Sequence, residues 1–370
     1  MNEAGRRWRL ILGRYAQQSL PSGQLTAQEA AIDQVLGYLY DREYTERGHR
    51  LQGGGSGASQ PTAITWLERT RQLFPKSTLE RLQAQAVEHY GLTELLADPQ
   101  AARTLEASPE LAAALLRVRG KLNANLEAGL RTVIEKVVAQ IVARIKMSFI
   151  MAISGHRNRQ QRSMVASARN FDWRATVRAN LSHYDQRNKR LLIDQARFNS
   201  RMKRRLQWDV ILCIDQSGSM AGSVLYSAVC ASILAGLPGI NVRLIVFDTA
   251  VVDMSHLASD PVSVLMTVQL GGGTDIAGAL AYCEQLVRTP KRTVLALVSD
   301  FEEGGSVQQL LATVTRLREA GVKLLGLAAL DMQGDASFDR HIGAELANRG
   351  MNIAALTPDR FAEWLAEVMQ

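Results

Sequence analysis

The chain has 370 residues, of which 46% are hydrophobic and 21% are charged. That length allows two domains, each with its own core, and the composition excludes a disordered or fibrous protein. The net charge of +7 is unevenly distributed, because residues 156–206 hold fourteen Lys and Arg against three Asp, a net +11 that leaves −4 for the rest. An anionic partner would therefore bind this segment rather than the whole surface.

The sequence favours a protein of a reducing, aqueous compartment. Residues 1–15 mix arginines with apolar residues and lack the apolar core of a secretory signal. The most apolar long window, residues 132–153, contains four charged side chains, so we expect no membrane span. Cys213, Cys230 and Cys283 fall in apolar segments, which indicates buried free thiols. We expect a cytoplasmic protein.

Residues 1–155 show no convincing strand pattern and are expected to form an all-α N-terminal domain. The clearest helical signal lies in the stretch from residue 109 to 153. Apolar residues recur there at three- and four-residue steps, namely Leu126, Leu130, Ile134, Val137, Val138, Ile141, Val142 and Ile145. This spacing predicts an amphipathic helix that needs a packing partner.

Residues 156–207 are the basic segment. They contain four aromatic residues, Phe171, Trp173, Tyr184 and Phe198, which is too many for a free tail. We expect a partly ordered basic connector that wraps against one domain or both.

Residues 208–370 alternate between apolar runs of strand length and helical stretches. The expected strands are 210–214, 242–247, 294–298, 322–328 and, more weakly, 351–355. The expected helices are 222–236, 275–288, 305–320, 338–349 and 358–369. Continuous apolar strands separated by helices predict a mostly parallel sheet covered on both faces, which is a doubly wound, Rossmann-like α/β fold.

Polar residues with a metal-binding pattern follow the expected strands. Asp215, Ser217 and Ser219 come directly after the first strand, and Asp300 follows the third. Thr274 follows three glycines in a loop before a helix. Because ligands of open α/β sheets bind at the carboxyl edge, these five side chains are expected to converge there.

The residue types indicate which cation this group would hold. Two carboxylates and three hydroxyls form a set of hard oxygen ligands without His or Cys. Such a set selects Mg²⁺, with Mn²⁺ or Ca²⁺ as substitutes, over Zn²⁺ or Cu²⁺. Each piece alone is also an ordinary turn or helix cap, and only the three together, in order and at one edge, point to a metal.

These motifs resemble the metal-ion-dependent adhesion site (MIDAS) of von Willebrand factor A (VWA) domains. The resemblance covers about residues 208–370, and all five positions match. It implies that Ser217, Ser219 and Thr274 are direct ligands and that Asp215 and Asp300 act largely through water. It also implies an open metal position for a carboxylate from a partner protein.

One departure from the family pattern follows the last ligand. Many VWA domains have Asp-Gly there, whereas this chain has Asp300-Phe-Glu-Glu-Gly304. Glu302 or Glu303 could orient the metal site or occupy its open position when no partner is bound. The alternative is that both are solvated loop acids.

The whole chain is similar to bacterial cytoplasmic VWA proteins with a helical N-terminal region, including the YehP-like proteins. The motifs that carry this likeness include Trp8–Gly13, Ala168–Asp172, Arg197–Ser200 and Gln269–Thr274. Related CoxE-type VWA proteins act beside AAA+ ATPases of the MoxR type. The resemblance therefore implies a metal-dependent adaptor that works with such an ATPase in protein remodelling, complex assembly or metal-centre maturation.

RNA binding and catalysis are the two alternative functions. In a Ro-like RNA-binding protein the basic segment would contact phosphates, through Arg157, Arg159, Arg162, Arg169, Arg174 and Arg178. The alternative for those arginines is a connector packed on the acidic remainder of the chain. An enzyme is not expected, because the chain has no P-loop and no histidine in the metal-site loops.

Overall fold

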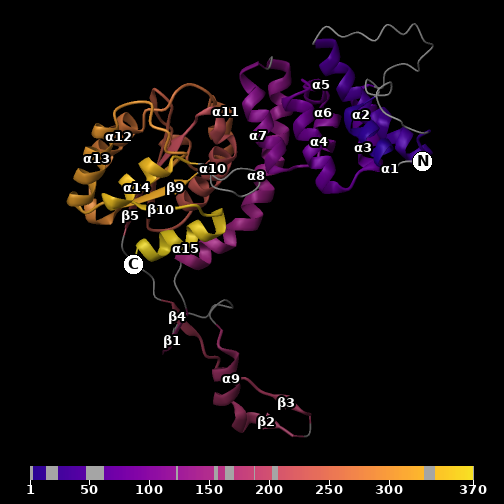
Figure 1. The fold of residues 1–370 in the computed structure, drawn as a ribbon. Helices are drawn as coiled ribbons and strands as arrows, with labels where there is room; N and C mark the ends of the chain where they lie inside the picture. The colour runs from indigo at the N-terminus through magenta and orange to yellow at the C-terminus, as the bar shows by residue number, and fades with distance from the viewer. Residues whose placement is uncertain are drawn as a thin grey trace.

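The computed structural model describes residues 3–13, 24–46, 62–121, 124–153, 157–162, 171–186, 188–201, 207–328 and 338–369. Figure 1 shows three parts in chain order, which we call the helical region (residues 3–153), the arm (residues 157–201) and the α/β region (residues 207–369). The N-terminus lies at the end of the helical region farthest from the α/β region.

The described residues of the helical region form helices only, as expected. They are α1 (Glu3–Leu12), α2 (Ala27–Glu46), α3 (Ala63–Leu73), α4 (Lys76–Glu88), α5 (Glu94–Ala97), α6 (Pro99–Thr104), α7 (Pro109–Val118) and α8 (Ala124–Ile153). The stretch expected to stay helical from 109 to 153 is divided by a 3₁₀ turn, Arg119–Lys121. Gly120 lies in this turn, and glycine is a poor helix former.

The α/β region is built on a six-stranded sheet in the order β10-β9-β8-β5-β6-β7. The strands are β5 (Trp208–Asp215), β6 (Ile240–Phe247), β7 (Val251–Asp253), β8 (Thr293–Ser299), β9 (Lys323–Ala328) and β10 (Asn352–Ala354). All pairs are parallel except β6 with β7. The doubly wound, mostly parallel sheet is confirmed, and β7 is an added antiparallel edge strand.

Both faces of this sheet are buried. Alternate residues of β5 point to opposite faces, so that Val210 and Leu212 join one core and Ile211 and Cys213 the other. The first core includes α10 (Ala221–Ala235), α11 (Pro261–Thr267) and α15 (Pro358–Val368). The second includes α12 (Ile276–Leu286), α13 (Val307–Ala320) and α14 (Arg340–Asn348).

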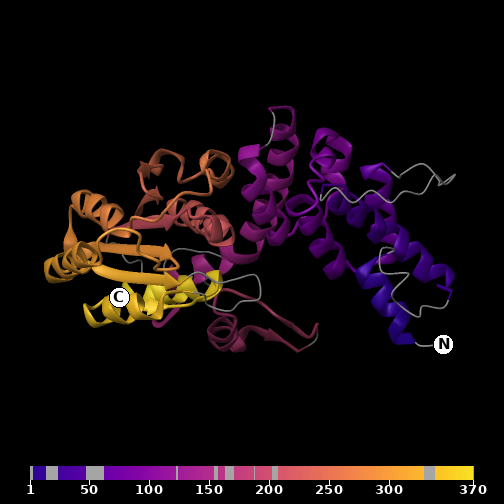
Figure 2. The ribbon, with the colours of Figure 1, turned by 45° about the horizontal axis from the view of Figure 1, so that its top comes forward.

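The first core does not stop at the α/β region. It continues through α10 into α7 and α8, so one set of buried side chains connects the sheet with the helical region. The rings of Phe149 on α8 and Phe361 on α15 lie 6.1 Å apart, and the Ser148 hydroxyl donates to Asp359 at 3.2 Å. Figure 2 shows the two regions side by side. The amphipathic face expected on α8 therefore has its partner.

Helix α10 explains an apolar stretch that could be mistaken for a membrane span. Residues Gly218–Ala235 have the length and the mean hydropathy, 1.5, of a membrane-crossing helix, and 56% of that window is buried. Because α10 packs between the sheet and the helical region, its apolar character is accounted for by the core. This window is the one candidate within the described residues.

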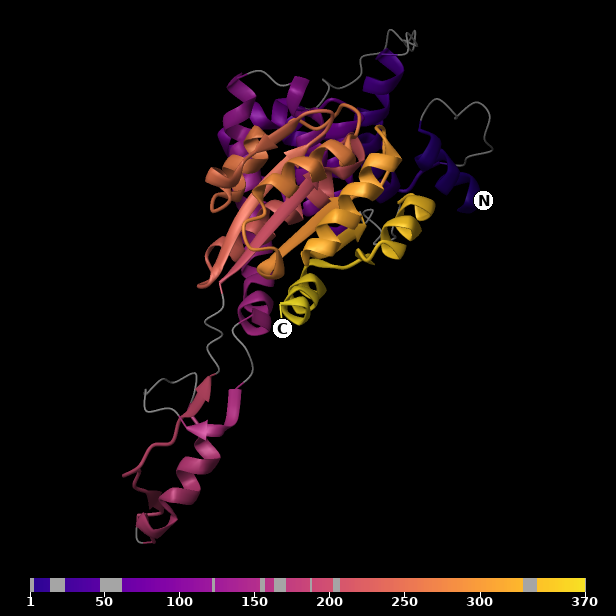
Figure 3. The same ribbon diagram turned by 90° about the vertical axis from the view of Figure 1, so that its left-hand side faces the viewer.

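The basic segment forms a small folded arm instead of a wrapped connector. Strands β1 (Arg157–Arg162) and β4 (Asn199–Arg201) pair antiparallel at its base, and α9 (Trp173–Ala179) leads to a hairpin of β2 (Tyr184–Asp185) and β3 (Arg190–Leu191). Figures 1 and 3 show this arm extending away from the other two regions. The described residues of the arm do not show the expected packing against either domain; their buried contacts, such as those of Asn180 and of the Phe171 and Phe198 rings, lie within the arm.

Candidate functional site

Asp215 ends β5 and is fully buried at the carboxyl edge of the sheet. Its Oδ1 accepts a hydrogen bond from the Ser217 backbone N–H at 2.8 Å, and its Oδ2 accepts one from the Ser299 hydroxyl at 2.8 Å. Burial raises the pKa of this carboxyl, the hydrogen bonds from Ser217 and Ser299 oppose that effect, and the nearby Asp300 adds to it. The site therefore holds a carboxylate that a cation would stabilise.

Ser217, Ser219 and Asp300 form a chain of oxygen atoms beside it. The two hydroxyls lie 3.3 Å apart, and the Ser219 hydroxyl donates to Asp300 Oδ2 at 2.9 Å. Asp215 and Asp300 come from adjacent parallel strands, β5 and β8, whose carboxyl ends meet at one edge. The structure thus brings together four of the five predicted ligands.

The chain turns sharply after Asp300. Phe301 has φ +60, a left-handed conformation that is costly for a residue with a side chain. Its N–H donates to the Ser299 hydroxyl at 3.0 Å, and its buried ring meets Phe338 edge-on at 5.8 Å. These contacts hold the turn in which Asp300 accepts the hydrogen bond from Ser219.

Thr274 belongs to a loop that lies against the loop after β8. The Gly304 N–H donates to the Thr274 carbonyl at 2.9 Å. A Cβ at Gly304 would come within 2.7 Å of that carbonyl, so only glycine allows this approach. Gly271 and Gly272, with φ +138 and +87, turn the chain before the threonine. The fifth predicted ligand is therefore carried to the same edge.

Residues that sequence reasoning missed connect these loops. Gln216 donates from Nε2 to Asp248 Oδ2 at 3.0 Å, and its backbone carbonyl accepts from the Gly271 N–H at 3.1 Å. The Asp248 carbonyl accepts from the Asp275 N–H at 2.9 Å. The only signal of this role in the sequence is the position of Asp248 directly after β6. Ser299, the support of Asp215, is the last residue of β8, one position beyond the expected strand 294–298.

Glu303 and Glu302 are placed differently from each other. The carboxylate of Glu303 accepts from the N–H groups of Ala277 and Gly305, at 3.2 and 2.7 Å, so it lies at the start of α12. Burial raises the pKa of this carboxyl, and neighbouring Asp275 adds to the effect. Glu302 is exposed, and its backbone N–H donates to Asp300 Oδ1 at 3.2 Å. Glu303 thus connects the loop that follows Asp300 with the start of α12, just after Thr274.

The residues present fit a hard divalent cation. The polar atoms that meet at the edge are carboxylate and hydroxyl oxygens, with Ser219 exposed and Ser217 partly exposed. Oxygen donors open to solvent are what Mg²⁺ takes. Within the described residues no three His, Cys, Asp or Glu form a metal cluster, and this site has only two carboxylates. Its chemistry is that of hydroxyls supported by acids.

The arginines proposed to contact nucleic acid all belong to the basic segment. Arg157, Arg159 and Arg162 lie on β1, and Arg174 and Arg178 lie on α9. Arg169 lies outside the described residues. The described positions are thus carried by one projecting element, away from the metal-site loops (Figure 3).

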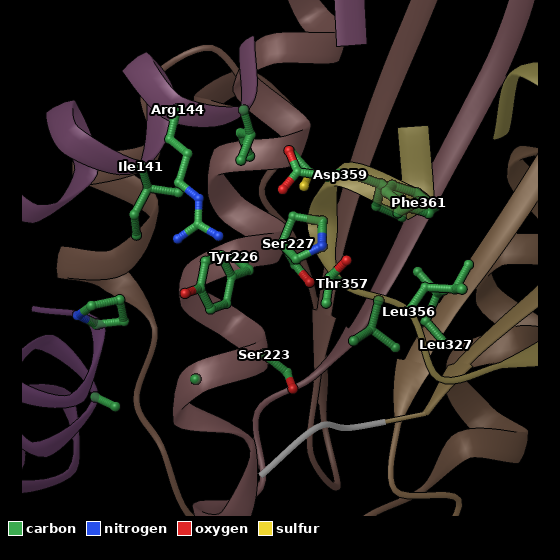
Figure 4. A pocket seen from close by; sticks show the side chains of 18 of the residues that line it. Ile141, Arg144, Ser223, Tyr226, Ser227, Leu327, Leu356, Thr357, Asp359 and Phe361 are labelled. Carbon is green, nitrogen blue, oxygen red and sulfur yellow. The ribbon is translucent and has the colours of Figure 1, made fainter. Parts of the chain in front are cut away.

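A cavity of about 480 Å³ opens beside the first turns of α10. Figure 4 shows Arg144 from α8 pointing into it toward Tyr226, with Asp359 nearby. Burial raises the pKa of Tyr226, as do the carboxylates of Glu110 and Asp359, while Arg144 lowers it. The cavity lies at the junction of the helical and α/β regions.

Sequence comparisons identify similar proteins along the whole chain. The family model described as "VWA domain containing CoxE-like protein" matches residues 136–365. A protein of Escherichia coli strain K12, described as "Uncharacterized protein YehP", is 43% identical over 367 residues, which cover 98% of this chain and 96% of that protein.

Solved structures are more distant. The von Willebrand factor type A protein from Catenulispora acidiphila is 14% identical, with a TM-score of 0.33, over 46% of this chain and 44% of its own. An aerotolerance-related membrane protein from Bacteroides fragilis is 15% identical, with a TM-score of 0.34, over 43% of this chain and 96% of its own. At these values they carry no argument about function.

Proposed function

Because this chain belongs to the family of VWA domain containing CoxE-like proteins, we propose that it is a cytoplasmic, metal-dependent adaptor that docks a partner protein's carboxylate on a Mg²⁺ ion. The observation that carries the proposal is the chain of oxygens from Ser217 through Ser219 to Asp300, next to buried Asp215. Ser219 in this chain is exposed and Ser217 partly exposed, so the oxygens are open to a cation from solvent.

Each residue has a distinct part in this proposal. Ser217, Ser219 and Thr274 would bind Mg²⁺, or Mn²⁺ or Ca²⁺ in its place, directly. Asp215 and Asp300 would act through water, which suits Asp215 because both of its oxygens already accept hydrogen bonds from the protein. The bound ion would supply positive charge for a carboxylate, since neutral hydroxyl ligands leave that charge uncompensated. We propose binding and not catalysis.

The proposed partner is a MoxR-type AAA+ ATPase or its client. Support comes from the family and from the continuous core between sheet and helical region, which would let the helical region hold one protein while the metal site holds another. The process served would be protein remodelling, complex assembly or metal-centre maturation.

Metal binding is tested by calorimetric titration of Mg²⁺ and Mn²⁺ into the full chain. We expect one site in the wild type and at least about a tenfold loss of affinity in Ser219→Ala, because a direct oxygen ligand is removed. Ser306→Ala is the matched control, since Ser306 only caps α13. A wild type that binds neither ion at millimolar concentration would contradict the proposal.

Partner docking is tested with the purified MoxR-type ATPase of the same genome. A complex should form with Mg²⁺ and disappear with EDTA or in Ser219→Ala, whereas Ser306→Ala should bind like the wild type. A complex that is equally stable in EDTA would exclude docking through the metal.

A further inference from the structure

The arm is a folded element held by contacts of its own. Buried Asn180 makes four hydrogen bonds across it, donating from Nδ2 to the carbonyls of Thr176 and Gln195 and accepting at Oδ1 from the N–H groups of Asp194 and Gln195. The rings of Phe171 and Phe198 pack at 5.7 Å and close its base. The shape of the arm therefore does not depend on its outer side chains.

Those outer side chains are of two kinds. Large apolar and aromatic groups are exposed, with Trp173 at 62% and Tyr184 at 49%. The arm also carries the exposed cations Arg174, Arg178 and Arg190. The Arg174 guanidinium lies 5.3 Å from the centre of the Trp173 ring. An aromatic face with a cation beside it is a stacking surface for a base.

The cations of the arm are not balanced by its acids. Arg174, Arg178 and Arg190 form no ion pair with a carboxylate in the described part of the chain. Asp172 accepts from the Ala175 N–H to cap α9, and Asp185 accepts from both N–H groups of Asn188. Elsewhere, buried and half-buried arginines such as Arg9 and Arg117 pair with acids. The positive charge of the arm thus remains available to a polyanion.

We propose that the arm binds single-stranded nucleic acid, independently of the metal site. The net +11 of residues 156–206 matches a polyphosphate chain more closely than a protein surface with scattered acids. Exposed Trp173 and Tyr184 reach bases only where these are unstacked, which favours a single strand over a duplex. Projection from the molecule leaves the arm accessible on several sides (Figure 3).

The test is fluorescence anisotropy with the full chain and a labelled oligouridylate of about 20 nucleotides, a length that spans more than one typical single-strand site. A DNA strand and a duplex of equal length are run beside it. We expect both single strands to bind better than the duplex, with affinity falling as salt rises by about 0.7 log unit per log unit for each phosphate contacted. The ratio of the affinities for the RNA strand and the DNA strand shows which of the two the arm prefers.

Two variants separate charge from stacking. Arg178→Ala with Arg190→Ala should weaken binding and reduce the salt slope by about 1.4, because two phosphate contacts are lost. Trp173→Ala should weaken binding about 5- to 100-fold with the slope unchanged, since stacking is not ionic. Arg288→Ala with Arg292→Ala, exposed cations of the α/β region, is the matched control and should bind like the wild type.

Three results would overturn the proposal. The first is no binding near physiological salt. The second is a loss of affinity in the Arg288 and Arg292 control equal to that in the arm variants. The third is competition by polyglutamate as strong as that by RNA, which would indicate an acidic protein partner instead. Ser219→Ala and EDTA should leave RNA binding unchanged, so this test and that of the metal site fail separately.

Discussion

The carboxyl edge of the sheet and the arm both present polar side chains to solvent. Those of the edge are hydrogen-bonded to protein groups, whereas the arginines of the arm have no carboxylate partner in the described part of the chain. At the edge, Asp215, Ser219 and Asp300 are hydrogen-bonded to each other or to neighbouring loops. On the arm, Arg178 and Arg190 have no carboxylate partner among the described residues. The edge is a preorganised, acidic site for one ion, and the arm is a cationic surface for an extended ligand.

The two also differ in how the sequence builds them. The edge is assembled from three loops that lie up to 85 residues apart and meet only because parallel strands end together. The arm is one contiguous excursion, closed where β1 pairs with β4. A destabilising substitution at the edge should therefore lower the stability of the whole core, whereas one in the arm should affect the arm alone.

The largest effect on the stability of the main fold is expected from Ser299→Ala. The change removes the hydroxyl that donates to Asp215 Oδ2 and leaves a fully buried carboxylate oxygen without that partner. Because hydrogen bonds to charged groups are worth about 1.5–3 kcal/mol, the free energy of unfolding should fall by about that amount. Urea denaturation in EDTA measures it without any contribution from bound metal.

Ser306→Ala serves as the control for this change, because that hydroxyl caps α13 by accepting from the Gln309 N–H. Loss of a cap costs about 1 kcal/mol. If Ser299→Ala lowered the free energy of unfolding no more than Ser306→Ala, the hydrogen bond from Ser299 would not be an important support of Asp215.

Asn180→Ala should unfold the arm and little else. Four hydrogen bonds of a buried amide are lost, and each costs about 1 kcal/mol. Hydrogen exchange should accelerate over residues 171–198 while the main thermal transition stays where it is. Asn188→Ala, which removes one exposed side-chain bond to Asp185, is the control. A shift of the main transition would show that the arm and the core are coupled.

Arg119→Ala should loosen the metal loop from a distance. Its guanidinium, in the helical region, donates to the carbonyl of Val268 at 2.7 Å, at the end of α11 and six residues before Thr274. Losing this bond costs about 1 kcal/mol, or about fivefold in affinity if the loop alone moves. Calorimetry with Mn²⁺ and hydrogen exchange of residues 268–273 measure the two effects.

Arg117→Ala is the matched control for that prediction, because Arg117 pairs with Glu88 inside the helical region. Equal metal affinity in Arg119→Ala and Arg117→Ala would mean that the helical region does not influence the edge.

The sequence was sufficient for the main strands and for where their ligands would lie. Buried parallel strands such as β5 and β8 are continuous apolar runs, and a polar residue directly after such a run is placed at the edge by the topology. Short elements gave no such signal. β7 has three residues, and α11 has seven, so each is too short for its hydrophobic pattern to repeat often enough to be recognised.

Contacts between distant residues could not be predicted in this way. Arg119 and Val268 are 149 residues apart, and nothing in either segment identifies the other. The role of Ser299 becomes visible only when β5 is known to be the neighbour of β8. The basic segment showed its charge and aromatics, but its internal fold includes the Asn180 hydrogen bonds, which depend on the turn at residues 194–195.

The smallest effect on stability is expected from Leu192→Cys, which compares the two parts of the molecule by chemical reactivity. Leu192 is 63% exposed on the arm, so a thiol there should react with a maleimide at the rate of a free cysteine. The three native thiols are buried, and burial with the nearby Asp359 raises the pKa of Cys230 to about 12. At neutral pH that thiol holds almost no reactive thiolate.

For Leu192→Cys, one label per chain is expected before denaturation and four after it. For the wild type, no label is expected before denaturation and three after it. Labelling of the wild type at the same rate as the variant would mean that the core beside α10 opens as readily as the surface of the arm.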